Sequence, residues 1–142
     1  MFRMIASGLA LSAILSSPVL AETFEVKMLN KGAEGTMVFE PSFVRIAPGD
    51  TVVFVPTDKS HNAESVKGMM PEGAEGFTGK MNKEVEATFD AEGVYGVMCK
   101  PHYAMGMVMT IAVGDVDAPE DFFEGRIPRK AQERFEAQLE NL

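Results

Sequence analysis

Side chains with metal-binding chemistry gather in two stretches of this sequence. The only cysteine, Cys99, is followed three residues later by His102 and then by two methionines, Met105 and Met107. The other of only two histidines, His61, lies 38 residues upstream of Cys99. A thiolate, two imidazoles and a thioether form the ligand set of a blue-copper site, in which a weak axial methionine completes a His₂Cys plane. Copper is therefore the leading hypothesis.

Each of these residues has a simpler explanation when taken alone. A lone cysteine is most often a buried small hydrophobe, a lone histidine is usually structural, and methionine usually fills a core. The combination is informative, because a chance Cys-x₂-His is improbable in a chain with one cysteine and two histidines. This spacing suits a short loop that returns two ligands to one ion. It leaves both Met105 and Met107 open as the axial ligand.

Residues 1–21 are typical of a secretory signal peptide. Arg3 supplies a positive n-region, residues 5–15 form an apolar run, and Val19-Leu20-Ala21 offers small side chains before a cleavage point. A membrane anchor is the alternative, but the apolar run is shorter than the roughly 18 residues that a spanning helix needs. Cleavage after Ala21 would leave an exported domain, residues 22–142, which in a bacterium lies in the periplasm.

The predicted export and the net charge reduce the number of function classes that fit this sequence. One cysteine cannot form an internal disulfide, and an unpaired thiol is a liability in an oxidising compartment unless a metal occupies it. The net charge is −8, and loss of Arg3 with the signal peptide would leave 12 basic and 21 acidic side chains, a net charge of −9. Such an acidic chain argues against nucleic acid as a partner.

The sequence from Glu22 to Val113 predicts an all-β domain, and about 120 residues are enough for one core. Short segments with strand patterns, separated by glycine and proline turns, are residues 24–28, 38–39, 43–46, 51–55, 84–89, 93–99 and 107–113. The β-branched run at 51–55 predicts a strand buried on both faces. Seven or eight short strands indicate a sandwich or a barrel.

Alternation of side chains along the strands places the sulfur atoms. Cys99 shares a strand face with Val97 and Tyr95, and Met107 shares one with Met109 and Ile111. If these faces form the core, both sulfur atoms point inward from adjacent strands joined by the ligand loop. The histidines should differ in depth, with His102 reaching the surface behind Pro101 and His61 lying deeper.

The C-terminal segment predicts a helical tail, residues 117–142, packed on the sandwich. A short first helix is expected from the acids and proline of residues 117–121, and Gly125 would end it. A second helix should begin near Pro128. Its apolar residues are spaced for one helix face: Ala131, Phe135, Leu139 and Leu142.

Taken together, these segments resemble the pseudoazurin family of blue-copper cupredoxins. The matching motifs span nearly the whole mature chain, at residues 24–35, 37–41, 61–62, 71–75 and 101–107. The resemblance implies an eight-stranded Greek-key sandwich with two C-terminal helices and one type 1 copper ion. It also implies electron donation to a copper nitrite reductase in denitrification.

The same resemblance assigns individual roles. The metal ligands carried over by position are His61, Cys99, His102 and Met107. Asn62 corresponds to the residue that tethers the two ligand loops and helps to orient the thiolate. Lys100 stands beside the cysteine, where the family leads us to expect a threonine.

A redox partner is expected to dock around His102, because tunnelling favours the shortest route from the metal to the surface. Pro101, Ala104 and Met105 would form a small apolar patch, which suits transient redox interfaces. Six lysines of the β domain could steer an acidic partner to this patch. They are Lys31, Lys59, Lys67, Lys80, Lys83 and Lys100.

Two other function classes remain at this point. A copper carrier could use the nine methionines of the mature chain, although most of them sit singly or on strands where core packing explains them. A thiol enzyme could use Cys99 as nucleophile and His102 or His61 as base. Such an enzyme would also need an orienting residue and an oxyanion site, which no motif here supplies.

Overall fold

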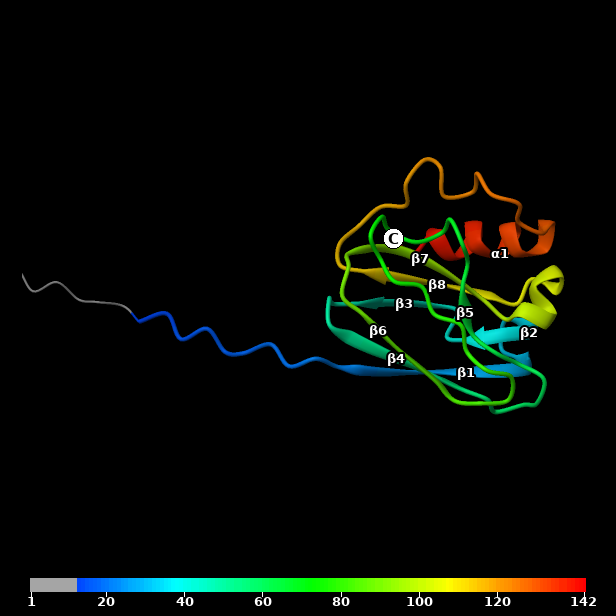
Figure 1. Cartoon of the computed structure of the whole chain (residues 1–142), viewed down its shortest axis with the longest axis horizontal. Helices are drawn as coiled ribbons and strands as arrows, with labels where there is room; N and C mark the ends of the chain where they lie inside the picture. The colour runs from blue at the N-terminus through cyan, green and yellow to red at the C-terminus, as the bar shows by residue number, and fades with distance from the viewer. Residues whose placement is uncertain (1–12) are drawn as a thin grey trace, which may run out of the picture.

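Two four-stranded sheets pack face to face in the computed structural model, which describes residues 13–142 (Figure 1). One sheet has the order β2 (Gly35–Glu40), β1 (Thr23–Gly32), β4 (Asp50–Val55), β6 (Val85–Phe89). The other has the order β3 (Phe43–Ile46), β8 (Val108–Val113), β7 (Gly93–Met98), β5 (Glu64–Ser65). The β1–β4 and β3–β8 pairs are parallel and the others antiparallel. The expected eight-stranded sandwich is confirmed.

Period-two burial builds the core between the sheets. In β6, Val85, Ala87 and Phe89 are buried and the residues between them are exposed. The prediction that residues 51–55 are buried on both faces was wrong. Val52 and Phe54 are fully buried, but the alternate residues of β4 are only half-buried, because no helix among residues 13–142 packs on the outer face of that strand.

The strand that is buried throughout is β8, because a helix covers its outer face. That helix, α1 (Arg129–Leu139), packs Ala131 and Phe135 against Val108 and Phe122. Gln138 joins the helix to the strand: its Nε2 donates to the Val108 carbonyl at 3.0 Å, and its Oε1 accepts from the Thr110 hydroxyl at 2.9 Å. The position of α1 on β8 is therefore fixed by apolar packing and by directed hydrogen bonds.

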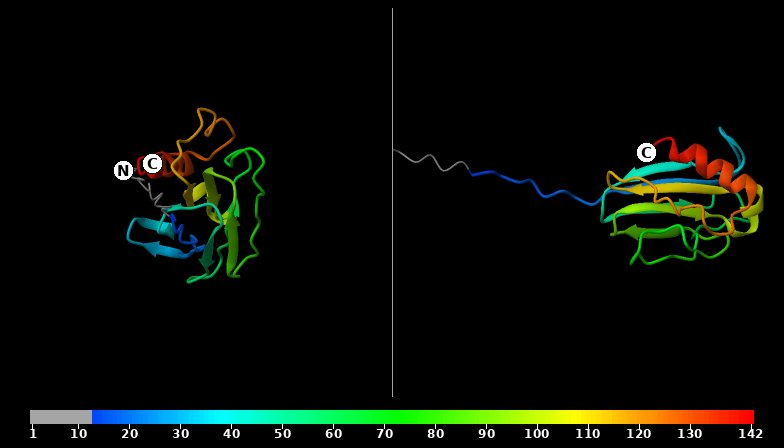
Figure 2. Two further views of the ribbon diagram at one scale, coloured as in Figure 1. Left: turned by 90° about the vertical axis from the view of Figure 1, so that its left-hand side faces the viewer. Right: turned by 90° about the horizontal axis from the view of Figure 1, so that it is seen from above.

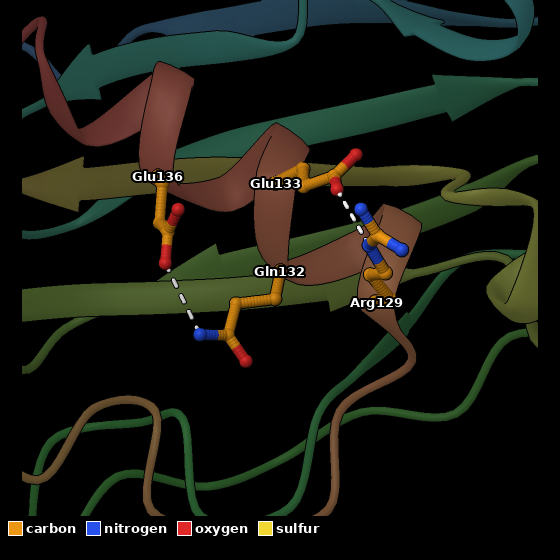
Figure 3. A network of polar contacts seen from close by, with 4 residues as sticks. All are labelled: Arg129, Gln132, Glu133 and Glu136. Carbon is orange, nitrogen blue, oxygen red and sulfur yellow. Dashed lines mark hydrogen bonds and ion pairs between the residues drawn. The ribbon is translucent and has the colours of Figure 1, made fainter.

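The other face of α1 points to solvent. Figure 3 shows two side-chain pairs one turn apart on this face, Arg129 with Glu133 and Gln132 with Glu136. Exposed pairs of this kind contribute little to stability. The amphipathic spacing predicted for the second tail helix is confirmed for Ala131, Phe135 and Leu139, whereas Leu142 lies beyond the end of α1.

The first predicted tail helix is absent from the structure, and α1 is the one α-helix among residues 13–142. Residues 117–125 form turns instead, in which the Phe122 N–H donates to the Pro119 carbonyl and the Glu124 N–H to the Asp121 carbonyl. Too few residues lie between Pro119 and Gly125 for a run of i→i+4 hydrogen bonds. Burial of the Phe122 ring against α1 decides the local conformation.

Residues 13–22 precede the first strand and are exposed, including the large apolar side chains of Ile14, Leu15, Val19 and Leu20. Figure 2 shows this segment running away from the sandwich. The n-region and most of the apolar run of the predicted signal peptide lie outside the described residues. Within residues 13–142, no helix is long and apolar enough to cross a membrane.

Asp50 joins the first residue before β1 to the turn that begins β4. Its carboxylate is only 5% exposed and accepts from the N–H groups of Glu22 and Ala47, both at 2.8 Å. We predict that Asp50→Ala lowers the free energy of unfolding by about 1–3 kcal/mol, because two part-buried N–H donors lose a charged acceptor. Urea unfolding of the metal-free protein measures this loss. The exposed Asp90→Ala is the control, and equal stability of the two variants would contradict this account.

Candidate metal centre

Three of the predicted ligands meet at one end of the sandwich. The ligand atoms of His61, Cys99 and His102 all lie within 4.8 Å of one another. His61 precedes β5, Cys99 directly follows β7, and His102 lies in the short 3₁₀-helix η1 (Lys100–Met105). The 38-residue separation is closed because β5 pairs with β7, with Glu64 opposite Met98.

The three ligand atoms form a nearly regular triangle. The Nδ1 atoms of His61 and His102 are 3.1 Å apart, and Cys99 Sγ lies 3.6 Å and 3.5 Å from them. The point in their plane that is equidistant from the three atoms lies about 2.0 Å from each. This distance matches a zinc–nitrogen bond of about 2.0–2.1 Å and is about 0.3 Å shorter than a zinc–sulfur bond of about 2.3 Å. The residues therefore fit one transition-metal ion, and an N₂S donor set suits copper.

His61 is held in the tautomer that a metal requires. Its Nε2 lies 2.8 Å from Asn30 Oδ1, and since an amide oxygen only accepts, Nε2 carries the proton. The Nδ1 lone pair then faces Cys99 and His102. Burial, together with the neighbouring His102, lowers the pKa of His61, and Asp58 partly opposes this shift. His61 is therefore neutral at neutral pH.

Sequence reasoning assigned no role to Asn30. It lies on β1, 31 residues before His61, and an asparagine close to a Lys-Gly turn is typical of a hairpin end. Only the packing of the loop after β4 over β1 shows that this amide faces the imidazole.

Cys99 is fully buried, and this burial raises the pKa of its thiol. Hydrogen bonds from the backbone N–H groups of Asn62 and His102 oppose the shift, whereas the nearby Glu64 adds to it. The thiol thus stays protonated near neutral pH unless a cation binds next to it. This environment suits a metal ligand, because a coordinating metal ion deprotonates the thiol directly.

Asn62 joins the two ligand loops. Its Oδ1 accepts from the Lys100 backbone N–H at 2.8 Å, and its Nδ2 donates to the Gly79 carbonyl and to Glu64. This is the tether that the resemblance implied. Lys100 takes part through its backbone while its side chain is exposed, so lysine in place of threonine leaves the tether intact.

The two candidate methionines differ sharply in burial. Met107 is fully buried in the same core cluster as Cys99, whereas Met105 is 44% exposed. Hydrogen bonds hold the backbone of Met107 to the other two candidate ligands of this loop. The Met107 carbonyl accepts from the Cys99 N–H at 3.0 Å, and the Met107 N–H donates to the His102 carbonyl at 3.1 Å. As the alternation predicted, both sulfur-bearing residues belong to the core.

The two histidines also differ as expected, with His61 fully buried and His102 half-buried. Pro101, Ala104 and Met105 beside His102 are exposed. The ligand loop, residues 99–107, joins β7 to β8 and contains η1. In Figure 1 this loop, drawn in yellow, lies at the end of the sandwich opposite the N-terminal segment. The metal-binding residues thus approach the surface through one imidazole.

Comparison with known proteins agrees with this geometry. The family of copper binding proteins, plastocyanin/azurin, matches residues 26–114. A pseudoazurin of Paracoccus pantotrophus is 49% identical over 138 residues, which cover 95% of this chain and 94% of that protein. A pseudoazurin of Methylorubrum extorquens is 42% identical, covering 95% of this chain and 94% of that protein.

Solved structures give the same result. The crystal structure of pseudoazurin from Methylobacterium extorquens AM1 superposes with a TM-score of 0.75 at 43% identity, covering 84% of this chain and 98% of that one. Native pseudoazurin from Hyphomicrobium denitrificans superposes with a TM-score of 0.76 at 42% identity, with the same coverage. The chain therefore belongs to the copper-binding plastocyanin/azurin family and, within it, to the pseudoazurins.

Proposed function

We propose that this protein is a blue-copper electron carrier that uses His61, Cys99, His102 and Met107 as its metal ligands. The observation that supports this most directly is the triangle of ligand atoms with sides of 3.1–3.6 Å. When bound, copper supplies one-electron chemistry by alternating between Cu(II) and Cu(I). The protein supplies a fixed ligand set and excludes water, since His61, Cys99 and Met107 are fully buried.

The rigidity of the ligands suits electron transfer. Asn30 fixes the His61 ring, Asn62 fixes the backbone after Cys99, and hydrogen bonds to Cys99 and His102 fix the Met107 backbone. Ligands that are held from outside the metal move little when the charge of the ion changes. Small rearrangement is what a one-electron carrier needs.

The same geometry disfavours the two alternatives. A nucleophilic cysteine needs a lowered pKa and access to substrate, whereas Cys99 is buried with a raised pKa. A methionine-based carrier needs several exposed thioethers, but among the methionines of residues 22–142 only Met81 and Met105 are exposed. Met28, Met69, Met107 and Met109 are buried in the core. Core packing accounts for these methionines.

We further propose export to the periplasm with cleavage after Ala21. Four large apolar side chains of residues 13–21 are exposed, so the folded domain gains nothing from them. The first link between the chain and the sandwich is the Glu22 N–H on Asp50. Removal of residues 13–21 would therefore leave the contacts within the sandwich unchanged.

The proposed redox partner is a copper nitrite reductase of a denitrifying bacterium, docking around His102. Support comes from the exposed Met105 beside the half-buried imidazole, and from the exposure of the lysines of the β domain named above. A small apolar patch with charged surroundings gives fast association and fast release.

Copper binding by the proposed ligands predicts a strongly coloured protein. Cu(II) should give an intense visible band from thiolate-to-copper charge transfer, and Cys99→Ala should abolish the band completely, because Cys99 is the only thiol. Absorption spectroscopy of the copper-loaded proteins measures both effects. A colourless Cu(II) complex of the unaltered protein would refute the blue-copper assignment.

The axial assignment predicts unequal effects of two similar substitutions. Met107→Leu should shift both the reduction potential and the visible spectrum, whereas Met105→Leu should leave them nearly unchanged. Leucine preserves volume and apolar character in both cases, so core packing is largely retained. Voltammetry and absorption spectra of the two variants compare them, and the reverse ranking would identify Met105 as the ligand.

Burial of neutral His61 predicts acid sensitivity of the metal-free protein. The folded-state pKa of His61 lies below its ordinary value of 6.5, so the unfolded chain binds more protons. The stability contribution is present above about pH 6.5 and is lost as pH falls through the lowered pKa. We expect His61→Gln to flatten this loss and His102→Gln to change it less, in urea unfolding measured across pH. An unaltered pH profile in His61→Gln would contradict the assignment.

The docking proposal predicts salt-sensitive electron transfer. The rate of reduction of a copper nitrite reductase should fall as ionic strength rises, because steering charges are screened. Lys59→Glu and Lys100→Glu should each slow the reaction several-fold at low salt. Arg129→Glu, on the exposed face of α1, is the control. Rates that are independent of salt, or equal effects of the three reversals, would exclude docking through these lysines.

A further inference from the structure

We propose that Arg134, on the C-terminal helix, is a positioning residue for the axial methionine. By holding the backbone at Gly106, it sets how closely the Met107 thioether approaches the copper ion. This inference rests on the proposed ligation by Met107, and the experiments below test the two separately.

The Arg134 guanidinium binds backbone carbonyls from two distant parts of the chain. Nη1 donates to the Gly106 carbonyl at 2.8 Å and to the Met37 carbonyl at 2.7 Å, and Nη2 donates to the Thr36 carbonyl at 2.8 Å. The side chain is half-buried. A planar guanidinium with donors in a fixed fork can hold several acceptors in one arrangement. Arg134 thus links α1, strand β2 and the end of the ligand loop.

The peptide unit between Gly106 and Met107 is fixed at both of its polar groups. Arg134 holds its carbonyl, and its N–H donates to the His102 carbonyl at 3.1 Å. Because a peptide unit is planar and rigid, these two bonds fix the Cα of Met107. The Met107 carbonyl then accepts from the Cys99 N–H. Three hydrogen bonds, to Arg134, His102 and Cys99, therefore fix the position of the backbone that carries the thioether.

Gly106 allows the helix to come this close. Its φ of 87° is left-handed, and a Cβ at this position would lie 3.2 Å from Arg134 Cδ and from the Lys130 backbone. The loop end and the first turns of α1 are thus in direct contact. In Figure 1 the beginning of α1 lies beside the ligand loop.

The helix that carries Arg134 is itself fixed on the strand that Met107 precedes. One turn further along, Gln138 bonds to Val108 and Thr110, and the fully buried Phe135 packs in the cluster that contains Val108. Because α1 is held in place on β8, Arg134 cannot move together with the Gly106 carbonyl. The guanidinium therefore restrains the position of that carbonyl at the end of the ligand loop.

The copper–thioether bond is weak, so its length follows from the protein more than from the metal. Loss of the Arg134 contacts should let Met107 retreat. A weaker axial donor destabilises Cu(II) more than Cu(I), because the doubly charged ion gains more from each donor, and the reduction potential should rise. Loss of a nearby positive charge by itself would stabilise Cu(II) and lower the potential. The sign of the change separates positioning from charge.

The test compares the copper-loaded Arg134→Gln and Arg134→Lys variants with the unaltered protein. Lysine keeps the charge but lacks the planar fork. We expect the potential to rise in both variants, and the visible spectrum to change in the direction that Met107→Leu produces, by a smaller amount. Arg129→Gln, on the exposed face of the same helix (Figure 3), should leave both unchanged. An unaltered potential in Arg134→Lys, or a lowered one in Arg134→Gln, would overturn the proposal.

A double-mutant cycle completes the test. With Met107→Leu in place, the thioether is gone, so adding Arg134→Gln should produce no further rise in potential. A rise of undiminished size would overturn the inference. If Met107→Leu alone leaves the potential unchanged, the proposed axial ligand fails instead. Should Arg134→Gln fail to fold, as judged by thermal unfolding of the metal-free protein, Arg134→Lys supplies the same cycle.

Discussion

The antiparallel register of β7 and β8 is the constraint from which the whole metal centre follows. Met98 lies opposite Val108, and the ladder ends in the hydrogen bond from the Cys99 N–H to the Met107 carbonyl. Residues that face each other in a ladder point to the same side of the sheet. The register therefore places both sulfur atoms on the core side, and the loop that joins the strands carries His102. A shift of one residue would turn one sulfur outward.

Around this register, the remaining contacts bring in the second histidine and close the site. Pairing of β5 with β7 carries His61 to the loop, and Asn62 then bonds to the backbone next to Cys99. Asn30 on the opposite sheet fixes the imidazole tautomer. Both sheets thus contribute to the site, and contacts between residues of this chain alone determine its shape. Such preorganisation is consistent with ligands that keep their places in either oxidation state.

Sequence patterns predicted the ligand faces because period two is a local property. Cys99, Val97 and Tyr95 could be assigned to one face before any partner strand was known. The apolar run of β4 gave a wrong prediction of burial on both faces, because its composition does not reveal whether a helix covers the outer face of the strand. Asn30 was missed for a related reason, since its role depends on which loop crosses β1. Arg134 was equally hidden, because a basic residue on an amphipathic helix is usually solvated.

The net charge of the chain also differs from the charge of particular segments. The chain as a whole is acidic, and residues 114–142 hold eight acidic and four basic side chains. The lysines proposed for docking belong instead to the β domain. At physiological ionic strength, fields beyond about 8 Å are screened. A partner that docked at His102, as proposed, would therefore respond to the nearest side chains, such as Lys100 next to Cys99, and the net charge would mainly affect solubility. A negative total is thus compatible with a surface that attracts an acidic protein.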